Sequence, residues 1–209
     1  MKISYILLFL LLFSQKGVGE METIANRIVE YLDDDKTVWN DIDRMRMVLG
    51  VEVLIHNILM IGTILIMAWV LKIFFEALVL LTAYGALKMS AGGVHFKKSS
   101  ACLIGTGIFV WAGVWIAKRM TIDLSYIIGI YLVCLIVLVL MGPQGTENNP
   151  ISEDNYDILR RRTVFLVGIY LVITVIMEQC IGVIPYLLFI AVTFETLSLL
   201  PSYLKNRSI

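Results

Sequence analysis

The sequence contains few cysteines and few histidines. Its 209 residues include three cysteines and two histidines, with no Cys-x-x-Cys pair and no His-Glu-x-x-His motif. Cys102, Cys134 and Cys180 are odd in number and far apart, which argues against a disulfide framework and fits a reducing compartment. The two histidines give poor support for a zinc peptidase. We therefore expect no metal and no other cofactor.

Charge is scarce as well. The 17 basic side chains balance the 17 acidic ones, and charged residues make up only 16% of the chain. No basic patch with interleaved aromatic residues is present, so we expect no nucleic-acid partner. The sequence also lacks a nucleotide-binding motif, which argues against an actively driven pump.

Apolar residues are abundant instead. They make up 59% of the chain, and the mean hydropathy is +0.85, whereas soluble domains are about 45–50% apolar and about 25% charged. A bilayer-spanning helix needs about 20 apolar residues. We therefore predict an all-α integral membrane protein with about six transmembrane helices. The expected spans are 49–71, 73–87, 102–116, 124–141, 164–181 and 184–200.

Two segments precede the first span. Residues 1–20 contain a short apolar stretch, too short to cross a bilayer, which we interpret as a signal, an anchor or an extension upstream of the true start. Residues 21–48 carry apolar side chains at helical spacing among charged ones. This pattern predicts amphipathic helices on the cytoplasmic membrane face or against the bundle, in a structural role or, less favoured, a partner-binding one.

The stretch from Gly85 to Gly107 holds one histidine and one cysteine, His95 and Cys102. A cysteine is a useful nucleophile only as its thiolate, which a nearby imidazole or a helix N-terminus stabilises. If the next helix begins near residues 99–100, Cys102 lies in its first turn. His95 and Cys102 could then form a thiol–imidazole pair. Taken alone, however, such residues are more often a surface histidine and a small buried side chain.

The spacing of the pair requires a bend in the chain. His95 precedes Cys102 by seven residues, a separation of about 10 Å along one continuous helix, too far for a hydrogen bond. Gly92 and Gly93 offer a hinge at which the segment can fold back. Lys88, with the lysines of the same stretch, adds positive potential that favours a thiolate.

This stretch resembles a known family motif. The run from Lys88 to His95, KMSAGGVH, followed by Cys102, is similar to the core motif of the accessory gene regulator protein B (AgrB) family, which usually has Arg in place of Lys88. The segment 143–151, PQGTENNPI, resembles the family's loop of Pro, polar residues, Asn and Pro. The resemblance covers most of the chain from Met21 onward.

The resemblance implies a function. Members of this family are bacterial membrane cysteine endopeptidases that process the precursor of a cyclic quorum-sensing peptide. By this likeness, residues 49–205 form the peptidase domain, with its catalytic loop at 88–102, and a short AgrD-like propeptide is the substrate. His95 would act as the base and Cys102 as the nucleophile that forms an acyl-thioester. The alternatives are a non-catalytic membrane scaffold or peptide exporter, and a relative that cleaves without cyclising.

Other residues are candidates for support of the catalytic pair. These are Lys88, Gly92, Gly93 and Glu76, and of them Glu76 is the favoured partner to orient the imidazole. Glu52 and His56 lie inside the first predicted span, where ionisable groups usually face the bundle interior. The expected partners are the propeptide and membrane lipid, and a homodimer is plausible.

The distribution of basic residues predicts the orientation in the plasma membrane. With six spans and a cytoplasmic N-terminus, the catalytic loop faces the cytoplasm, in line with the positive-inside rule. The basic residues on that side would be Lys88, Lys97, Lys98, Arg160, Arg161, Arg162, Lys205 and Arg207. The outside would keep mainly Lys72, Lys118 and Arg119.

Overall fold

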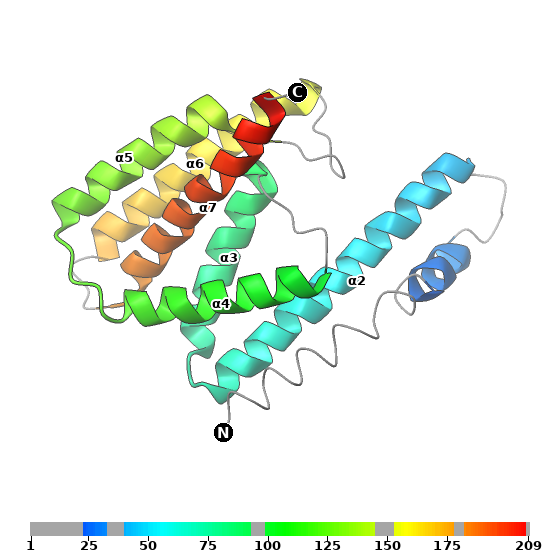
Figure 1. The fold of residues 1–209 in the computed structure, drawn as a ribbon, viewed down its shortest axis with the longest axis horizontal. Helices are drawn as coiled ribbons and strands as arrows, with labels where there is room; N and C mark the ends of the chain where they lie inside the picture. The colour runs from blue at the N-terminus through cyan, green and yellow to red at the C-terminus, as the bar shows by residue number, and fades with distance from the viewer. Residues whose placement is uncertain (1–22, 33–39, 93–98, 145–152, 178–181, 208–209) are drawn as a thin grey trace. The chain divides into compact units, whose positions relative to one another are not determined.

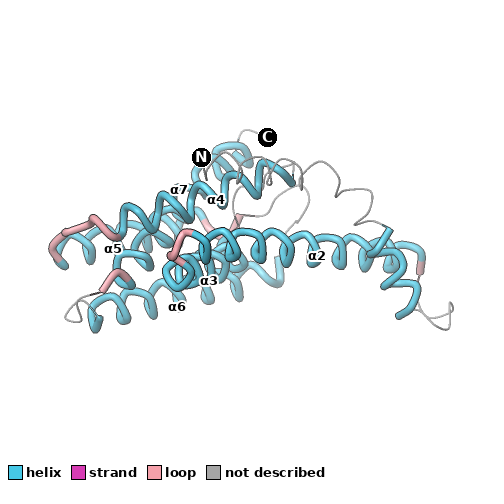
Figure 2. Tube along the Cα trace, turned by 90° about the horizontal axis from the view of Figure 1, so that it is seen from below, coloured by secondary structure: helices cyan, strands magenta, loops and turns pink. Residues whose placement is uncertain are grey.

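The computed structural model describes residues 23–32, 40–92, 99–144, 153–177 and 182–207. Residues 23–32 are helical, and six further helices follow. They are α2 (Asp41–Val70), α3 (Phe74–Ala91), α4 (Ser99–Ala117), α5 (Leu124–Met141), α6 (Glu153–Met177) and α7 (Ile184–Arg207). Within the described ranges there are helices and connecting loops but no strand, as Figure 2 shows. The prediction of an all-α protein is confirmed.

Four of these helices are long and apolar enough to cross a membrane. They are α2, α3, α5 and the segment Ile184–Pro201 of α7. The apolar part of α4, Ala101–Ala117, is shorter, and the first half of α6 carries acidic residues and three arginines. The chain is therefore a membrane protein, whereas the count of six spans stays a prediction.

The chain divides into two compact units. The first consists of residues Met1–Lys72 with Phe96–Gly107, and the second of Ile73–His95 with Ile108–Ile209. In the first unit, α2 has 30 residues, a length of about 45 Å, which exceeds the hydrocarbon thickness of about 30 Å. This helix begins at Asp41, ahead of the span expected from residue 49, because its charged first turns continue the helix beyond the apolar run.

Helix α7 is the central element of the second unit. It packs against α3, α5 and α6, and in Figure 1 it runs beside α5 and α6. Leu187 and Leu199 of α7 are fully buried, as are Leu80 and Leu87 of α3. This packing ties α3 to the rest of the unit and holds the end of α3, where the predicted catalytic loop begins.

Polar contacts add to the packing of the second unit. The hydroxyls of Tyr131 on α5 and Thr174 on α6 lie 3.1 Å apart and are buried. The Tyr170 hydroxyl of α6 donates to the Ala83 carbonyl of α3 at 3.2 Å. Inside an apolar environment each such group needs a partner, so these bonds fix which faces of the helices meet.

Candidate functional site

Helix α3 ends at Gly92, the first glycine of the predicted hinge. Its N–H donates to the Lys88 carbonyl at 3.1 Å, which closes the last turn of the helix. Gly92 has a φ of 77°, a conformation that other L residues rarely adopt. A Cβ at this position would also overlap the carbonyl oxygen of Gln144. The turn therefore requires glycine for two independent reasons.

The described start of the second family-like segment, Pro143–Gln144, lies against this turn. The Gln144 N–H donates to the Ala91 carbonyl at 2.9 Å, and Gly92 and Gln144 form an isolated parallel bridge. The Tyr156 hydroxyl of α6 donates to the Gly142 carbonyl at 3.0 Å. The start of the Pro143–Gln144 segment is thus held to the end of α3, although the two lie far apart in the sequence.

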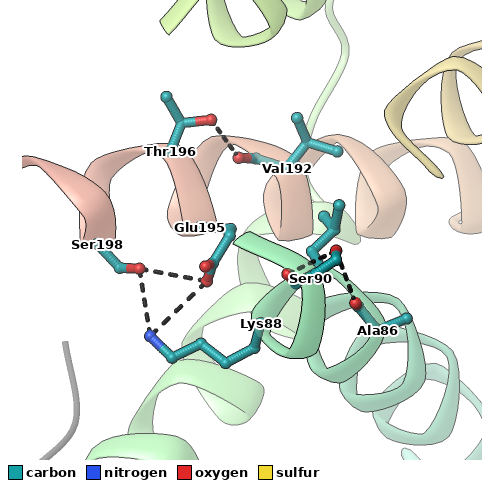
Figure 3. Close-up of polar contacts among 8 residues, drawn as sticks. Ala86, Lys88, Ser90, Val192, Glu195, Thr196 and Ser198 are labelled. Carbon is teal, nitrogen blue, oxygen red and sulfur yellow. Dashed lines mark hydrogen bonds and ion pairs between the residues drawn. The ribbon is translucent and has the colours of Figure 1, made fainter. Parts of the chain in front are cut away.

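Lys88 makes a buried ion pair one turn before Gly92. Its ammonium nitrogen lies 4.0 Å from Oε2 of Glu195 on α7, and the two side chains are 15% and 0% exposed. Ser198 bridges them: its hydroxyl donates to Glu195 Oε2 at 3.2 Å and accepts from Lys88 Nζ at 3.5 Å. Figure 3 shows this triangle between α3 and α7. We call Lys88, Glu195 and Ser198 the α3–α7 polar cluster.

The cluster is flanked by aromatic rings on one side. The Lys88 ammonium lies 5.9 Å from the centre of the Tyr84 ring, within cation–π range. That ring contacts Phe109 of α4 and Phe194 of α7, with centroids at 4.9 and 5.6 Å. Lys88 therefore faces both the Glu195 carboxylate and the aromatic ring of Tyr84.

One carboxylate oxygen of Glu195 has no hydrogen-bond partner in the part of the chain that the structure describes. Oε1 is buried without a hydrogen bond among the described residues, while Oε2 is shared by Ser198 and Lys88. Removing one member of a buried ion pair costs about 3–5 kcal/mol in soluble proteins, because the other charge is left uncompensated. Glu195 was not among the residues expected at the site, since it is hidden in an apolar run. The rule that intramembrane acids face the bundle interior would have singled it out.

Cys102 lies in the first turn of α4, as expected from the sequence, because that helix begins at Ser99. The thiol is half-buried, and its sulfur is 3.6 Å from the sulfur of Met60 on α2. Cys134 is buried in α5, which agrees with a packing role. His95, Gly93 and Cys180 lie outside the described residues, so the pairing of His95 with Cys102 stays a prediction.

Glu76 lies in the first turn of α3, whereas Gly92 follows the last. These positions are about 24 Å apart along the helix, at a rise of about 1.5 Å per residue. The carboxylate of Glu76 pairs with Lys118 at 2.6 Å. Its expected role in orienting the imidazole stays a prediction, as do those of Glu52 and His56, which are half-buried on α2.

The described ranges contain no group of three or more His, Cys, Asp or Glu side chains that could hold a metal ion. The arrangement can instead fix a backbone turn. Buried charges, a glycine that cannot be replaced without strain and a second loop all converge on the end of α3.

Comparison with known proteins identifies the family. The relatives include a protein named AgrB-like from Clostridium acetobutylicum, 24% identical over 77% of this chain and 76% of its own. Accessory gene regulator protein B of Staphylococcus carnosus is 27% identical over 67% of this chain and 75% of its own. The protein of the same name from Staphylococcus epidermidis is 25% identical over 81% of this chain and 88% of its own. No solved structure matches significantly. The model of the AgrB family, accessory gene regulator B, matches residues 21–199, and the chain therefore belongs to this family.

Proposed function

We propose that this protein matures a quorum-sensing autoinducer as a membrane cysteine endopeptidase acting on a short AgrD-like propeptide. The observation that carries the proposal is the family match over residues 21–199, which includes the Lys88 to Cys102 motif. The position of Cys102 in the first turn of α4 supports the role of nucleophile, because unpaired N–H groups and the helix dipole favour a negative sulfur there.

The proposed reaction uses the two motif residues. The imidazole of His95 accepts the proton of the Cys102 thiol, and the thiolate attacks the carbonyl carbon of the last residue of the future signal. The peptide C–N bond breaks, the leaving amine takes the proton from His95, and an acyl-thioester remains on Cys102. A Cys or Ser side chain of the substrate then displaces Cys102, which yields a cyclic thiolactone or lactone.

The chain offers groups that would assist these steps. The backbone N–H groups of the first turn of α4 can donate hydrogen bonds to the oxyanion that develops during attack. A site shielded from water favours cyclisation over hydrolysis of the thioester, and a membrane interface provides such shielding. The turn at Gly92, fixed by Gln144, sets the point at which the chain leaves α3.

Processing of the propeptide tests the proposal. The chain is co-expressed with a candidate AgrD-like propeptide, and cleavage is read by mass spectrometry. Wild type is expected to release the C-terminal remnant, Cys102→Ala and His95→Ala are expected to release none, and the control variants Cys134→Ala and Cys180→Ala are expected to retain activity. A cyclic product is lighter than the linear acid by one water.

Two outcomes would contradict the proposal. Processing by Cys102→Ala would show that the nucleophile is another residue. Export or binding of an unprocessed peptide by wild type, unchanged in Cys102→Ala, would favour the scaffold or exporter instead.

A further inference from the structure

We propose that Glu195 is a positioning residue, which fixes the end of α3 through Lys88 and thereby sets the geometry of the turn that leads to His95. This inference rests on the proposed peptidase function. It assigns a role to a residue of α7 that lies outside the Lys88 to Cys102 motif. Glu195 acts through other residues and makes no contact with substrate in this role.

The burial of Glu195 shows that the charge is costly. The side chain is 0% exposed, and one carboxylate oxygen has no hydrogen-bond partner among the described residues. A buried ion pair is weak evidence for stability, since apolar residues of similar volume often stabilise as well or better. Polar groups that break the local rules of packing concentrate at functional sites. The α3–α7 polar cluster lies one turn before Gly92, which indicates that its function concerns the turn at that residue.

The contacts form a continuous path from α7 to the turn. Glu195 holds the Lys88 side chain directly and through Ser198. The carbonyl of the same Lys88 accepts the N–H of Gly92, the last hydrogen bond of α3. The carbonyl of Ala91, the residue before Gly92, accepts the N–H of Gln144. A shift of Lys88 therefore moves both bonds that define the turn.

Ionic contact suits this task better than packing alone. An apolar contact is non-directional, whereas a lysine that donates to Ser198 and pairs with Glu195 has a defined register along α7. Misplacement of a catalytic group by about 1 Å can reduce the rate about a hundredfold. The pair therefore contributes to the rate of the chemical step and leaves substrate binding unchanged.

Kinetics with a matched set of variants test the proposal. Glu195→Gln keeps the shape and removes the charge, and we expect kcat for propeptide cleavage to fall about tenfold to a hundredfold with KM within about twofold. Lys88→Arg retains the pair and should keep kcat within about threefold. Thr196→Val is the control, because the buried Thr196 hydroxyl, next to Glu195, donates within its own helix to the Val192 carbonyl.

The double variant Lys88→Met/Glu195→Gln tests whether the ion pair positions the turn or only compensates two buried charges. It leaves no lone buried charge, so it folds even where one of the single variants does not. If the pair positions the turn, kcat of the double variant stays as low as that of the worse single variant. If the two charges only compensate each other, the double variant regains wild-type kcat, and the proposal is wrong.

Hydrogen exchange provides a readout that does not depend on activity. In the double variant, the amides of Gly92 and Gln144 should exchange at least about tenfold faster, while those in the middle of α5 keep their protection. Unchanged exchange at Gly92 and Gln144 would overturn the role of Glu195. If wild type processes no peptide, the proposed peptidase fails, and the exchange result still decides whether Glu195 fixes the turn.

Discussion

At the scale of single residues, Gly92 is the most constrained of the glycines that the structure describes. Its φ of 77° and the proximity of the Gln144 carbonyl both exclude a side chain. We predict that Gly92→Ala abolishes propeptide processing and lowers the free energy of unfolding by about 1–3 kcal/mol, the usual cost of a strained backbone conformation. Cleavage and thermal unfolding in detergent measure the two effects. Gly85→Ala, in the same helix with open space around it, is the control that should retain both.

The environments of the cysteines lead to a second prediction at this scale. Cys102 is half-buried at the start of a helix, whereas Cys134 is 5% exposed in α5. We expect N-ethylmaleimide to modify Cys102 well before Cys134 in the folded protein, and this modification to stop processing. Peptide mapping after timed labelling measures the order. Faster labelling of Cys134 would show that α5 is less tightly packed than the structure indicates.

The residues of the motif stand out in the sequence more clearly than the contacts that surround them. Lys88, Gly92 and Cys102 were identified because their spacing is specific, and the start of α4 at Ser99 confirms the expected place of Cys102 in a first turn. Glu195 was missed because hydropathy is averaged over a window, and one acidic side chain among apolar neighbours hardly changes the average. Its contact with Lys88 joins residues more than 100 positions apart, and periodicity within one helix carries no information about such a pair.

At the scale of elements, the apolar runs predict the positions of the helices better than the residues at which the helices begin and end. The run at 124–141 coincides with α5, whereas α6 begins at Glu153, ahead of the span expected from residue 164. The difference has a physical cause. Hydropathy marks the segment that lipid can contact, while backbone hydrogen bonding continues through the charged turns that precede it.

The contact of α5 with α6 leads to a prediction at this scale. Tyr131 and Thr174 share a buried hydrogen bond between the two helices. In a double-mutant cycle of Tyr131→Phe and Thr174→Val, we expect a coupling of about 0.6 kcal/mol, since such bonds in membrane proteins average about this value. Reversible unfolding in mixed micelles provides the free energies. A coupling near zero would mean that packing alone holds α5 to α6.

At the scale of the whole molecule, orientation determines whether a cytoplasmic propeptide reaches the site. The basic residues predict that the loop before α6 faces the cytoplasm and the loop before α5 faces outward. Two exposed positions report on these loops, Asp157 in α6 and Arg119 between α4 and α5. Because α5 lies between them in the chain and is long enough to span, they belong on opposite sides of the membrane.

Labelling of single cysteines tests this orientation. In a variant without the three native cysteines, Arg119→Cys should react with a membrane-impermeant maleimide in intact cells, and Asp157→Cys only after permeabilisation. The reverse pattern would place the end of α3, the Pro143–Gln144 segment and the α3–α7 polar cluster on the outer face. A propeptide made in the cytoplasm would then have to cross the membrane before cleavage, and a reducing environment would no longer protect the Cys102 thiol. The proposed cleavage of a cytoplasmic propeptide therefore depends on this orientation.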